Sequence, residues 1–360
     1  MLKFFERYNL KNKVIAVGVS GGADSLALVL RLKELGINVV ALSVDHGLRP
    51  SSNKEAQYVA ELMAKFGIEH HILEWKGDKP QTGIEAAARK ARYELLCSWC
   101  KVNDVQYLAV GHHRRDQAET FLLRLQRGSG LSGLCGMADI TVQNGINIIR
   151  PQLDDDPEEL RNYLLEKNIK WVEDESNQSD DFLRVKIRKF LPELEDKIAI
   201  SEKRLADTAK VLRLTREYLD FEVAKVLKNQ VRKWSDVVYS LSFNNLETWH
   251  SEISYRVLAE ILREVGKKDY APEADEIIRL ISALKKDDFK GCTLNGCEIF
   301  IAQKRLWIIP EVGAKQLLSK EKWEECLQFM PQYAKASLPY KVRRALYNEI
   351  LKENKNGQEK

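Results

Sequence analysis

The fold of this chain is decided by the stretch from Val14 to Ser25, which reads VIAVGVSGGADS. Its first six residues are apolar and mostly β-branched, which is typical of a short, fully buried strand in a parallel sheet. The small residues Ser20-Gly21-Gly22 then allow a sharp turn, and Asp24 opens a helical run that Gly36 ends. Such a loop binds anions, because free backbone N–H groups and the positive end of the helix dipole face it. The stretch therefore predicts a phosphate-binding loop.

Three interpretations of this loop compete. The plainest is a tight turn without a ligand. The second is the nucleophile elbow of serine hydrolases, since residues 18–22 fit G-x-S-x-G, although only 13 residues precede the strand. The third is the SGGxDS signature of the PP-loop ATP pyrophosphatases, which residues 20–25 resemble at every fixed position. No Gly-Lys-Ser/Thr follows, so the loop is not a Walker A loop. We favour the third interpretation.

Asp24 adds negative charge to a loop that would otherwise attract phosphate. The arrangement is consistent if Mg²⁺ lies between the carboxylate and the phosphate, because this ion prefers oxygen ligands. Asp24 is therefore the candidate magnesium ligand.

Length and composition are those of an ordinary globular protein. The 360 residues allow two or three domains, and 31% charged with 44% hydrophobic residues is a usual balance. No apolar run approaches the roughly 20 residues that span a bilayer, and early charges argue against a secretory signal. Six scattered cysteines favour reduced thiols in a cytoplasm. The net charge of +4 permits a nucleic-acid partner without requiring one.

Strand-like and helical segments alternate up to about residue 150, which favours an α/β fold with a Rossmann-like parallel sheet and helices on both faces. The expected strands are 14–19, 38–44, 69–74, 105–110 and 146–149. The expected helices are 24–35, 53–66, 84–102 and 116–127. Ligands bind at the carboxyl ends of parallel strands, so Ser20–Ser25, Asp45–Gly47 and Gly111–His113 should converge on one crevice.

Two segments offer charged side chains there, and each also has a plainer interpretation. Asp45 and His46 either line the crevice or form a turn that the aspartate caps. Arg89 and Arg92 lie three residues apart in a predicted helix and share one face. That face either holds a phosphate or is a solvated basic surface. Spacing alone favours the solvated surface.

The segment from His112 to Thr120 is the second dense group of functional side chains. Asp116 and Glu119 lie one turn apart at the predicted start of a helix, where their charges suit the dipole. The pair is either part of a well-capped helix or an acidic pocket for a cationic substrate or Mg²⁺. His112 and His113 point apart as sequence neighbours, which makes a zinc site a weak interpretation.

With these motifs in order, the chain resembles the tRNA(Ile)-lysidine synthetase family of PP-loop enzymes. The matching segments are SGGADS, VDHGLRPSSNKEA, GIEAAARKARYELL, GHHRRDQAETFLLRLQRGSGLSGLCGM and WVEDESNQSDDFLR, within residues 13 to 192. SGGxDS marks only the superfamily, whereas HHxxDQAET followed by Arg127–Leu134 is far more specific. Two positions depart from the family pattern. Arg115 stands where the family commonly has an acid, and Val185 where it tends to have asparagine.

The resemblance implies a ligase that uses ATP, Mg²⁺ and free L-lysine. Its target would be the wobble cytidine of the CAU anticodon in tRNA(Ile), which is adenylated and then attacked by the lysine amine to give lysidine. The implied ATP-binding residues are Ser20, Gly21, Gly22, Ala23, Asp24, Ser25, Asp45, His46 and His112. Asp116 and Glu119 would bind the lysine, and with Asp24, Arg89 and Arg92 they form the implied catalytic set. The implied tRNA-binding residues are Arg127, Arg184, Lys186 and Arg188. His112 and His113 are candidates for accepting the proton of the amine.

The second half of the chain is expected to contact the tRNA. Residues 182–235 hold 14 Lys and Arg against 8 Asp and Glu, a net charge of +6 that suits either a solvated helix face or RNA phosphates. We expect a catalytic domain at 1–192, a helical, basic region at 193–285, a small α+β region at 286–345 and a disordered tail at 346–360. Within residues 291–310, Asn295-Gly296 predicts a hairpin turn.

Two further functions stay open at this point. A PP-loop tRNA thiolase would use the same loop with sulfur chemistry, but such enzymes usually need paired CxxC motifs and the sequence offers only Cys97 and Cys100. A tRNA-binding protein without catalysis is the other alternative, for which Arg115 is the sole hint. The expected setting is cytoplasmic, without a membrane partner, and a homodimer is left open.

Overall fold

The computed structural model describes residues 1–47, 52–77, 80, 82–173, 183–286, 288–311 and 317–358. The chain divides between Arg216 and Glu217 into two compact units, inside a long helix rather than near residue 192. None of the helices described is both long and apolar enough to cross a membrane.

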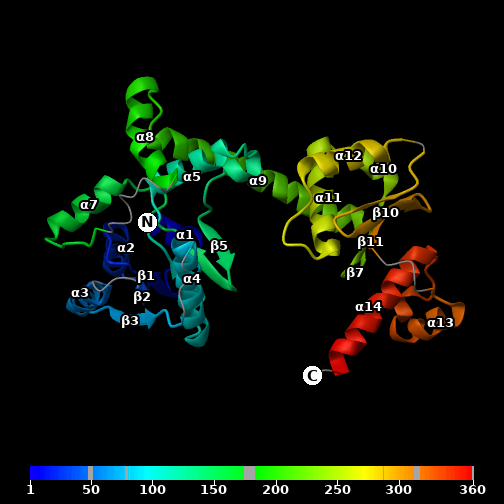
Figure 1. The fold of residues 1–360 in the computed structure, drawn as a ribbon, viewed down its shortest axis with the longest axis horizontal. Helices are drawn as coiled ribbons and strands as arrows, with labels where there is room; N and C mark the ends of the chain where they lie inside the picture. The colour runs from blue at the N-terminus through cyan, green and yellow to red at the C-terminus, as the bar shows by residue number, and fades with distance from the viewer. Residues whose placement is uncertain are drawn as a thin grey trace. The chain divides into compact units, whose positions relative to one another are not determined.

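The first unit, Met1–Arg216, is built on a six-stranded sheet in the order β3-β2-β1-β4-β6-β5 (Figure 1). Its strands are β1 (Val14–Gly18), β2 (Asn38–Asp45), β3 (Glu69–Glu74), β4 (Tyr107–Ala109), β5 (Ile140–Gln143) and β6 (Ile146–Ile149). The predicted strands are confirmed with ends within two residues, and all of them run parallel. The predicted α/β fold is thereby confirmed for this unit.

β5 is an addition to the predicted sheet, and it runs antiparallel to β6. Asn144 and Gly145 connect the two strands with φ angles of 49° and 74°. This is the two-residue hairpin turn that Asn-Gly favours, because both central residues need positive φ.

Helices cover both faces of this sheet. The helices of the unit are α1 (Leu2–Arg7), α2 (Ala23–Glu34), α3 (Ser52–Lys65), α4 (Ile84–Val102), α5 (Arg114–Gln126), α6 (Leu131–Leu134), α7 (Pro157–Glu166), α8 (Leu183–Ile198) and the first half of α9 (Glu202–Gln230). One core holds Ile15 and Val17 with α1, α2, α3 and α7. The alternate residue, Ala16, lies in a second core with α4 on the opposite face.

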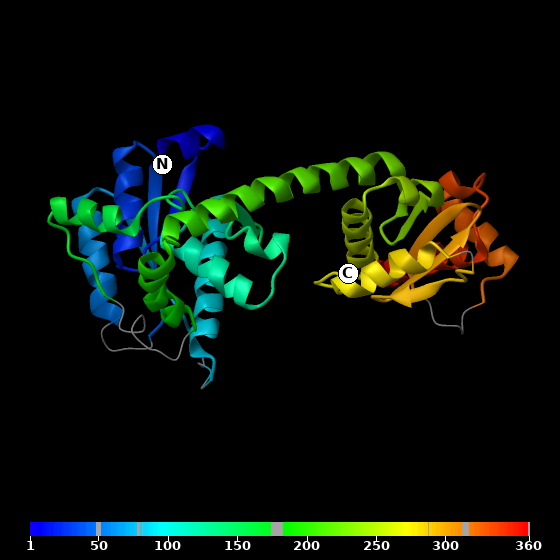
Figure 2. The same ribbon diagram turned by 90° about the horizontal axis from the view of Figure 1, so that it is seen from above.

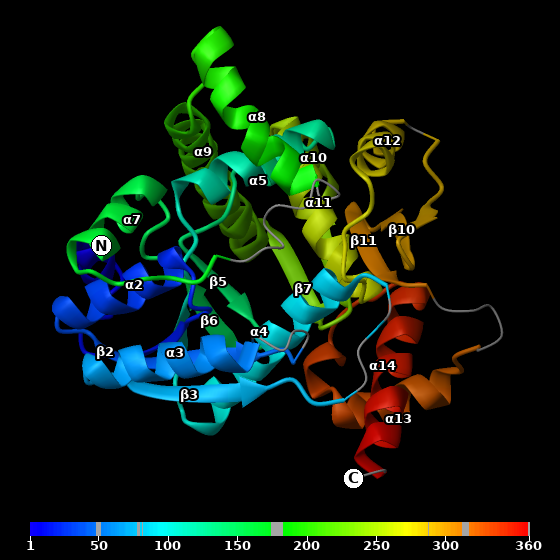
Figure 3. The same ribbon diagram turned by 60° about the vertical axis from the view of Figure 1, so that its left-hand side comes forward.

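A third cluster joins α5 to α8 and α9 (Figure 3). Its buried members are Ala118, Phe121, Ile187, Leu191, Leu205 and Ala209. α5 starts directly after the β4 loop, so this packing places α8 next to the carboxyl edge of the sheet.

The second unit, Glu217–Lys360, contains an antiparallel sheet in the order β7-β8-β11-β10-β9. Its strands are β7 (Val231–Ser235), β8 (Val238–Ser242), β9 (Cys292–Leu294), β10 (Cys297–Ala302) and β11 (Arg305–Pro310). The end of α9, α10 (Phe243–Thr248), α11 (Ser251–Gly266) and α12 (Ala274–Leu284) pack on one face. The other face carries α13 (Lys320–Phe329), the 3₁₀ helix η2 (Pro331–Tyr333) and α14 (Tyr340–Gln358) (Figure 2).

The predicted hairpin around Asn295-Gly296 is confirmed, with β9 and β10 as its strands. Two other expectations for this half were wrong. β7 and β8 lie within residues 193–285, which were expected to be helical. β8 is an inner strand whose Val238, Tyr239 and Leu241 are buried in the cores on the two faces of the sheet, and β7 pairs with it at the edge. α14 occupies much of the tail that was expected to be disordered, because Val342 and Leu346 are buried against the sheet.

Candidate functional site

Three loops meet at the carboxyl edge of the first sheet, after the neighbouring strands β1, β2 and β4. The predicted convergence is confirmed by this strand order. Gly111 in the β4 loop lies directly on the start of α2, since a Cβ there would be 3.1 Å from Asp24 C and from Ser25 N. Any side chain at this position would push the β4 loop away from α2.

The loop from Ser20 to Ser25 closes on itself. Ser20 N–H donates to Ser25 Oγ at 3.1 Å, and Ser25 Oγ donates to the Gly22 carbonyl at 3.0 Å. Gly21 has φ +86° and its position for a Cβ is 3.3 Å from Val59, so only glycine fits there without strain. Among the described residues, no side chain caps the first N–H groups of α2, which begins after Gly22. These amides and the helix dipole make the loop an anion-binding site.

Two buried polar side chains hold the two ends of this loop, and neither was predicted. Ser43 Oγ on β2 donates to the Val19 carbonyl at 2.8 Å, and His70 Nε2 lies 2.9 Å from the same oxygen atom of Ser43. Gln152, which is fully buried, donates from Nε2 to the Asp24 carbonyl at 2.8 Å. Ser43 is the polar residue inside the apolar run from Val39 to Val44, and Gln152 follows β6, so both positions carried a signal in the sequence.

The histidines of the β4 loop differ in charge state. His113 Nε2 is 3.4 Å from Asp24 Oδ2 and 3.6 Å from Asp116 Oδ2. Burial disfavours the imidazolium, but the Asp24 hydrogen bond and the negative charge of Asp116 outweigh it, so the pKa of His113 is raised. Burial lowers the pKa of His112, and Arg150 and Arg89 add to that effect. His113 is therefore the residue poised to carry a positive charge, and His112 is the neutral one.

Asp116 and Glu119 are held by arginines from α8. Arg184 donates to Glu119 Oε2 and to Asp116 Oδ1, the latter at 2.7 Å, and Arg188 donates to Glu119 Oε1 at 2.6 Å. The Glu119 side chain is fully buried. Burial disfavours the charged form of Asp116, but the positive charges of His113 and Arg184 outweigh it and lower its pKa. The acid pair predicted on α5 is thus held in ion pairs by two residues that were predicted to contact RNA.

Arg115 points away from this cluster. Its Nε donates to Glu202 on α9 at 2.6 Å, and its Nη2 lies 3.3 Å from Glu158 on α7. The side chain is 22% exposed. Arg115 therefore links α5 to α7 and α9 through ion pairs and makes no ion pair with Asp116 or Glu119 in the described structure.

We expect Arg115→Asp to lower the free energy of unfolding by about 2 kcal/mol, because it places three carboxylates together in a half-buried position. Urea denaturation of the full chain measures the loss. The matched control is the charge-swapped double variant Arg115→Asp with Glu202→Arg, which should regain part of it. An unchanged denaturation midpoint for the single variant would contradict this role.

Arg92, and Arg150 after β6, bring further positive charge towards the site. The Arg92 Nη2 atom lies 3.6 Å from the Cβ position of Gly18, at the end of β1. Burial lowers the pKa of Arg92, and the neighbouring charge of Arg89 adds to this. Burial likewise lowers the pKa of Arg150, which donates to the Ala138 carbonyl at 2.9 Å. Arg150 was not predicted, although it also follows a strand of the sheet.

Of the other predicted residues, Asp45 and His46 lie at the end of β2, and Arg127 and Lys186 lie on α5 and α8. Asp45 accepts a hydrogen bond from Gly47 N–H at 2.8 Å, so the capped turn is formed, and the His46 ring packs against Trp75. Arg127 is exposed at the far end of α5, about 16 Å along the helix axis from Asp116. Lys186 is exposed on α8, on a different face from Arg184 and Arg188.

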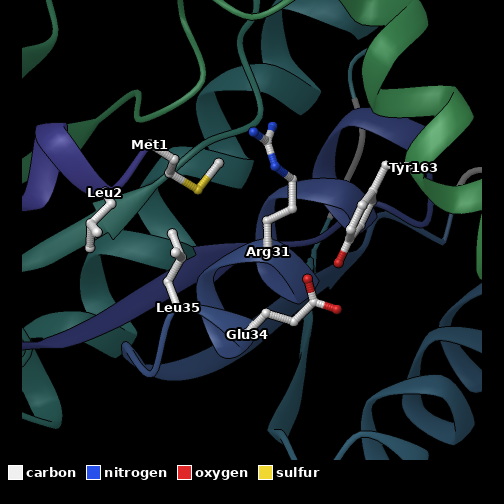
Figure 4. A pocket seen from close by; sticks show the side chains of 6 residues that line it. All are labelled: Met1, Leu2, Arg31, Glu34, Leu35 and Tyr163. Atoms are coloured by element: carbon white, nitrogen blue, oxygen red, sulfur yellow. The ribbon is translucent and has the colours of Figure 1, made fainter.

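A cavity of about 260 Å³ opens at the other end of α2 from the loop (Figure 4). It is lined by Met1, Leu2, Arg31, Glu34, Leu35 and Tyr163. Arg31 is paired with Asp155 at 2.6 Å and Glu34 with Lys167 at 2.5 Å, so its charges are already neutralised. The cavity is not part of the site at the sheet edge.

The PP-loop domain family model matches residues 1–194 of the chain. The tRNA(Ile)-lysidine synthase of Wolbachia sp. subsp. Brugia malayi (strain TRS) is 35% identical over 316 residues, which cover 86% of this chain and 73% of that protein. The tRNA(Ile)-lysidine synthase of Ruegeria pomeroyi is 34% identical over 310 residues, which cover 85% and 73%. The similarity to these relatives thus extends through both units.

Among solved structures, the U34-tRNA thiolase NcsA from Methanococcus maripaludis resembles 59% of this chain with a TM-score of 0.51. The alignment covers 77% of that chain at 20% sequence identity. Identity this low supports a shared fold and carries no argument about activity.

Proposed function

This chain belongs to the tRNA(Ile)-lysidine synthase family, and on that premise we propose that it joins L-lysine to C2 of the wobble cytidine in a CAU-anticodon tRNA(Ile). The observation that carries the proposal is the convergence, at one sheet edge, of an anion-binding loop with the acid pair Asp116 and Glu119. The reaction needs both, because ATP is polyanionic and lysine is cationic.

The loop from Ser20 to Ser25 is proposed to hold the β- and γ-phosphates of ATP through its backbone N–H groups and the start of α2. The site fits a magnesium ion in one respect, since a single partly exposed carboxylate, Asp24, faces it. Mg²⁺ is commonly held by one or two carboxylates together with substrate phosphates, and it would neutralise phosphate charge there. His113 also neutralises Asp24 in the structure.

We expect Ser43→Ala to raise the KM for ATP about fivefold with a small effect on kcat, since it releases the Val19 carbonyl that fixes the start of the loop. Initial rates at varied ATP concentration measure the change. Ser98→Ala, at an exposed position of α4, is the matched control. A KM that stays at the wild-type value would show that the loop holds its shape without this hydrogen bond.

The first chemical step makes cytosine C2 reactive. Its carbonyl oxygen attacks the α-phosphorus of ATP, pyrophosphate departs, and an O-adenylated cytidine forms. Arg92, with Arg89 on the same helix, is proposed to offset the negative charge that develops on the transferring group. The cytidine has to leave the stack of the anticodon loop to reach this edge of the sheet.

The second step is attack of the lysine ε-amine on C2, which breaks the C2–O bond and releases AMP. Asp116 and Glu119 are proposed to bind the lysine. In the structure Arg184 occupies both carboxylates, so the lysine would have to share or displace its contacts. The attacking amine must first lose a proton. His112 is neutral and can orient the amine by accepting a hydrogen bond, but its lowered pKa makes it a weak base for that proton.

The tRNA contacts are proposed at the exposed Arg127 and Lys186, whereas Arg184 and Arg188 serve the acid pair in this conformation. The cytoplasm, where tRNA is modified, is the proposed location, and a homodimer stays a prediction.

The thiolase alternative is weakened by Cys97 and Cys100. Both are buried, and burial raises the pKa of Cys97 and raises that of Cys100 to about 12, so neither is a ready thiolate.

The deciding experiment is ATP-dependent incorporation of radiolabelled lysine into a CAU-anticodon isoleucine tRNA transcript. An elongator methionine tRNA transcript with the same anticodon is the control. Label on the first transcript alone supports reaction, substrate and selectivity together. No label, despite intact binding of tRNA and ATP, would refute the proposal and direct attention to sulfur donors.

A further inference from the structure

Two arginines of the second unit lie on strands that flank β8. In the register of the sheet, Arg232 on β7 is opposite Ser240 on β8, and Arg305 on β11 is opposite Ser242. Alternate residues of a strand share a face, so both arginines lie on the face that also carries Trp234 and Trp307. They belong to the face that α13 and α14 partly cover, and Arg232 is exposed while Arg305 is half-buried.

Each guanidinium is held in a fixed orientation. Arg305 donates from Nε to Ser240 Oγ at 2.9 Å and from Nη2 to the Ser240 carbonyl at 3.2 Å. Trp234 Nε1 donates to the same Ser240 Oγ at 2.8 Å, which fixes the indole. Arg232 stacks on that indole, with Cζ 3.6 Å from the ring centroid. A guanidinium that stacks through its face keeps its N–H donors in the guanidinium plane, where they can bind an anion.

The positive charge of the pair is not compensated. Within the described part of the second unit, neither Arg232 nor Arg305 forms an ion pair with a carboxylate, unlike Arg256, which is paired with Glu252 and Asp220. Burial lowers the pKa of Arg305, and the nearby charge of Arg232 lowers it further. Two oriented guanidinium groups that repel each other are stabilised by an anion between them.

We propose that Arg232 and Arg305 together bind a phosphate group, and that this phosphate belongs to the backbone of the tRNA. The identity of the RNA rests on the proposed function. Planar guanidinium groups match the oxygens of a phosphodiester, and contacts of this kind position an RNA without reading its sequence. The site would therefore contribute affinity and orientation of the tRNA, whereas selection of the base is left to the first unit.

The test is the affinity of the full chain for the isoleucine tRNA transcript between about 50 and 200 mM salt. Arg232→Met and Arg305→Met should each raise the Kd about fivefold and reduce the slope of log K against log salt by about one. Arg232→Lys should lie between wild type and Arg232→Met, because it keeps the charge and loses the stacked fork. Arg279→Met is the matched control, since this exposed arginine is on α12, which packs on the other face of the sheet.

The KM values for ATP and lysine and the melting temperature show whether the variants are folded. An unchanged Kd and salt slope in a folded Arg232→Met, Arg305→Met double variant would overturn the proposal. Titration with inorganic phosphate separates the sources of the anion. Phosphate binding that the double variant loses, with tRNA affinity intact, would assign the site to a free phosphate and also overturn the RNA assignment. Failure of the proposed function would look different, because the wild-type chain itself would then incorporate no lysine.

Discussion

Replacing Asp24 with asparagine should lower the rate of lysine incorporation by about 100-fold or more while leaving tRNA affinity within about twofold. Asp24 is the carboxylate that faces the anion-binding loop, and groups that stabilise charge in a transition state commonly contribute two to three orders of magnitude. Asparagine keeps the size of the side chain and loses its charge. Single-turnover incorporation at saturating ATP, together with a tRNA binding titration, measures the two quantities separately.

Asp104→Asn is a matched control for this substitution. Asp104 is an exposed residue of the same unit with a φ of 55°, a conformation that asparagine tolerates well. It should leave the rate unchanged. If Asp24→Asn also incorporated lysine at the wild-type rate, the loop would not serve the chemistry and the catalytic proposal would fail.

The same variant has a second readout at His113. The Asp24 hydrogen bond and the charge of Asp116 hold the pKa of His113 above its usual value, against the effect of burial. Removing the charge of Asp24 should lower that pKa, because one of the two carboxylates near the ring is lost. NMR titration of the His113 ring resonances measures the shift. A downward shift with the fold intact would show that the loss of activity is electrostatic and local.

The parts of the fold that sequence predicted well were those with a strong local signal. The buried run before Ser20 and the alternation of strands and helices located every parallel strand, and topology then brought the three loops together. β5 had such a signal as well, in the turn at Asn144 and Gly145. β7 and β8 had no local signal of comparable strength. Both strands are short and contain polar residues, so their pairing depends on contacts with distant parts of the sheet.

The candidate site shows the same limit at the level of side chains. Local spacing placed Asp116 and Glu119 on one face of a helix, but it could not show that Arg184 would neutralise both. That arginine lies 65 residues from Glu119, and nothing near it in sequence records the partner. The spacing of basic residues in this segment does not show which of them pair with carboxylates and which face solvent. Packing of Ile187 and Leu191 against Phe121 turned the segment inward instead.

Replacing Arg184 with alanine should lower the free energy of unfolding by about 3 kcal/mol, because it removes one arginine from the fully buried Glu119, which Arg188 still contacts, and takes the same arginine from Asp116. Glu119→Gln should cost a similar amount. The double variant should cost less than the sum of the two, since the groups act on each other. Hydrogen exchange of the α5 and α8 amides in the full chain measures the loss of stability in the two helices that the ion pairs connect. Lys186→Ala, exposed on the same helix, should change it by less than about 0.5 kcal/mol.

The dependence of this stability on pH gives a further test of the same cluster. The pKa of Asp116 is lowered in the folded chain, because the positive charges of His113 and Arg184 outweigh the effect of burial. A lowered carboxyl pKa contributes stability that is present above the unfolded value of about 4 and is lost as pH falls through the folded value. The wild-type chain should therefore lose stability below about pH 4, and Arg184→Ala should lose less over that range, because part of the shift is already gone. Equal losses in the two proteins would mean that Arg184 does not stabilise the ionised form of Asp116.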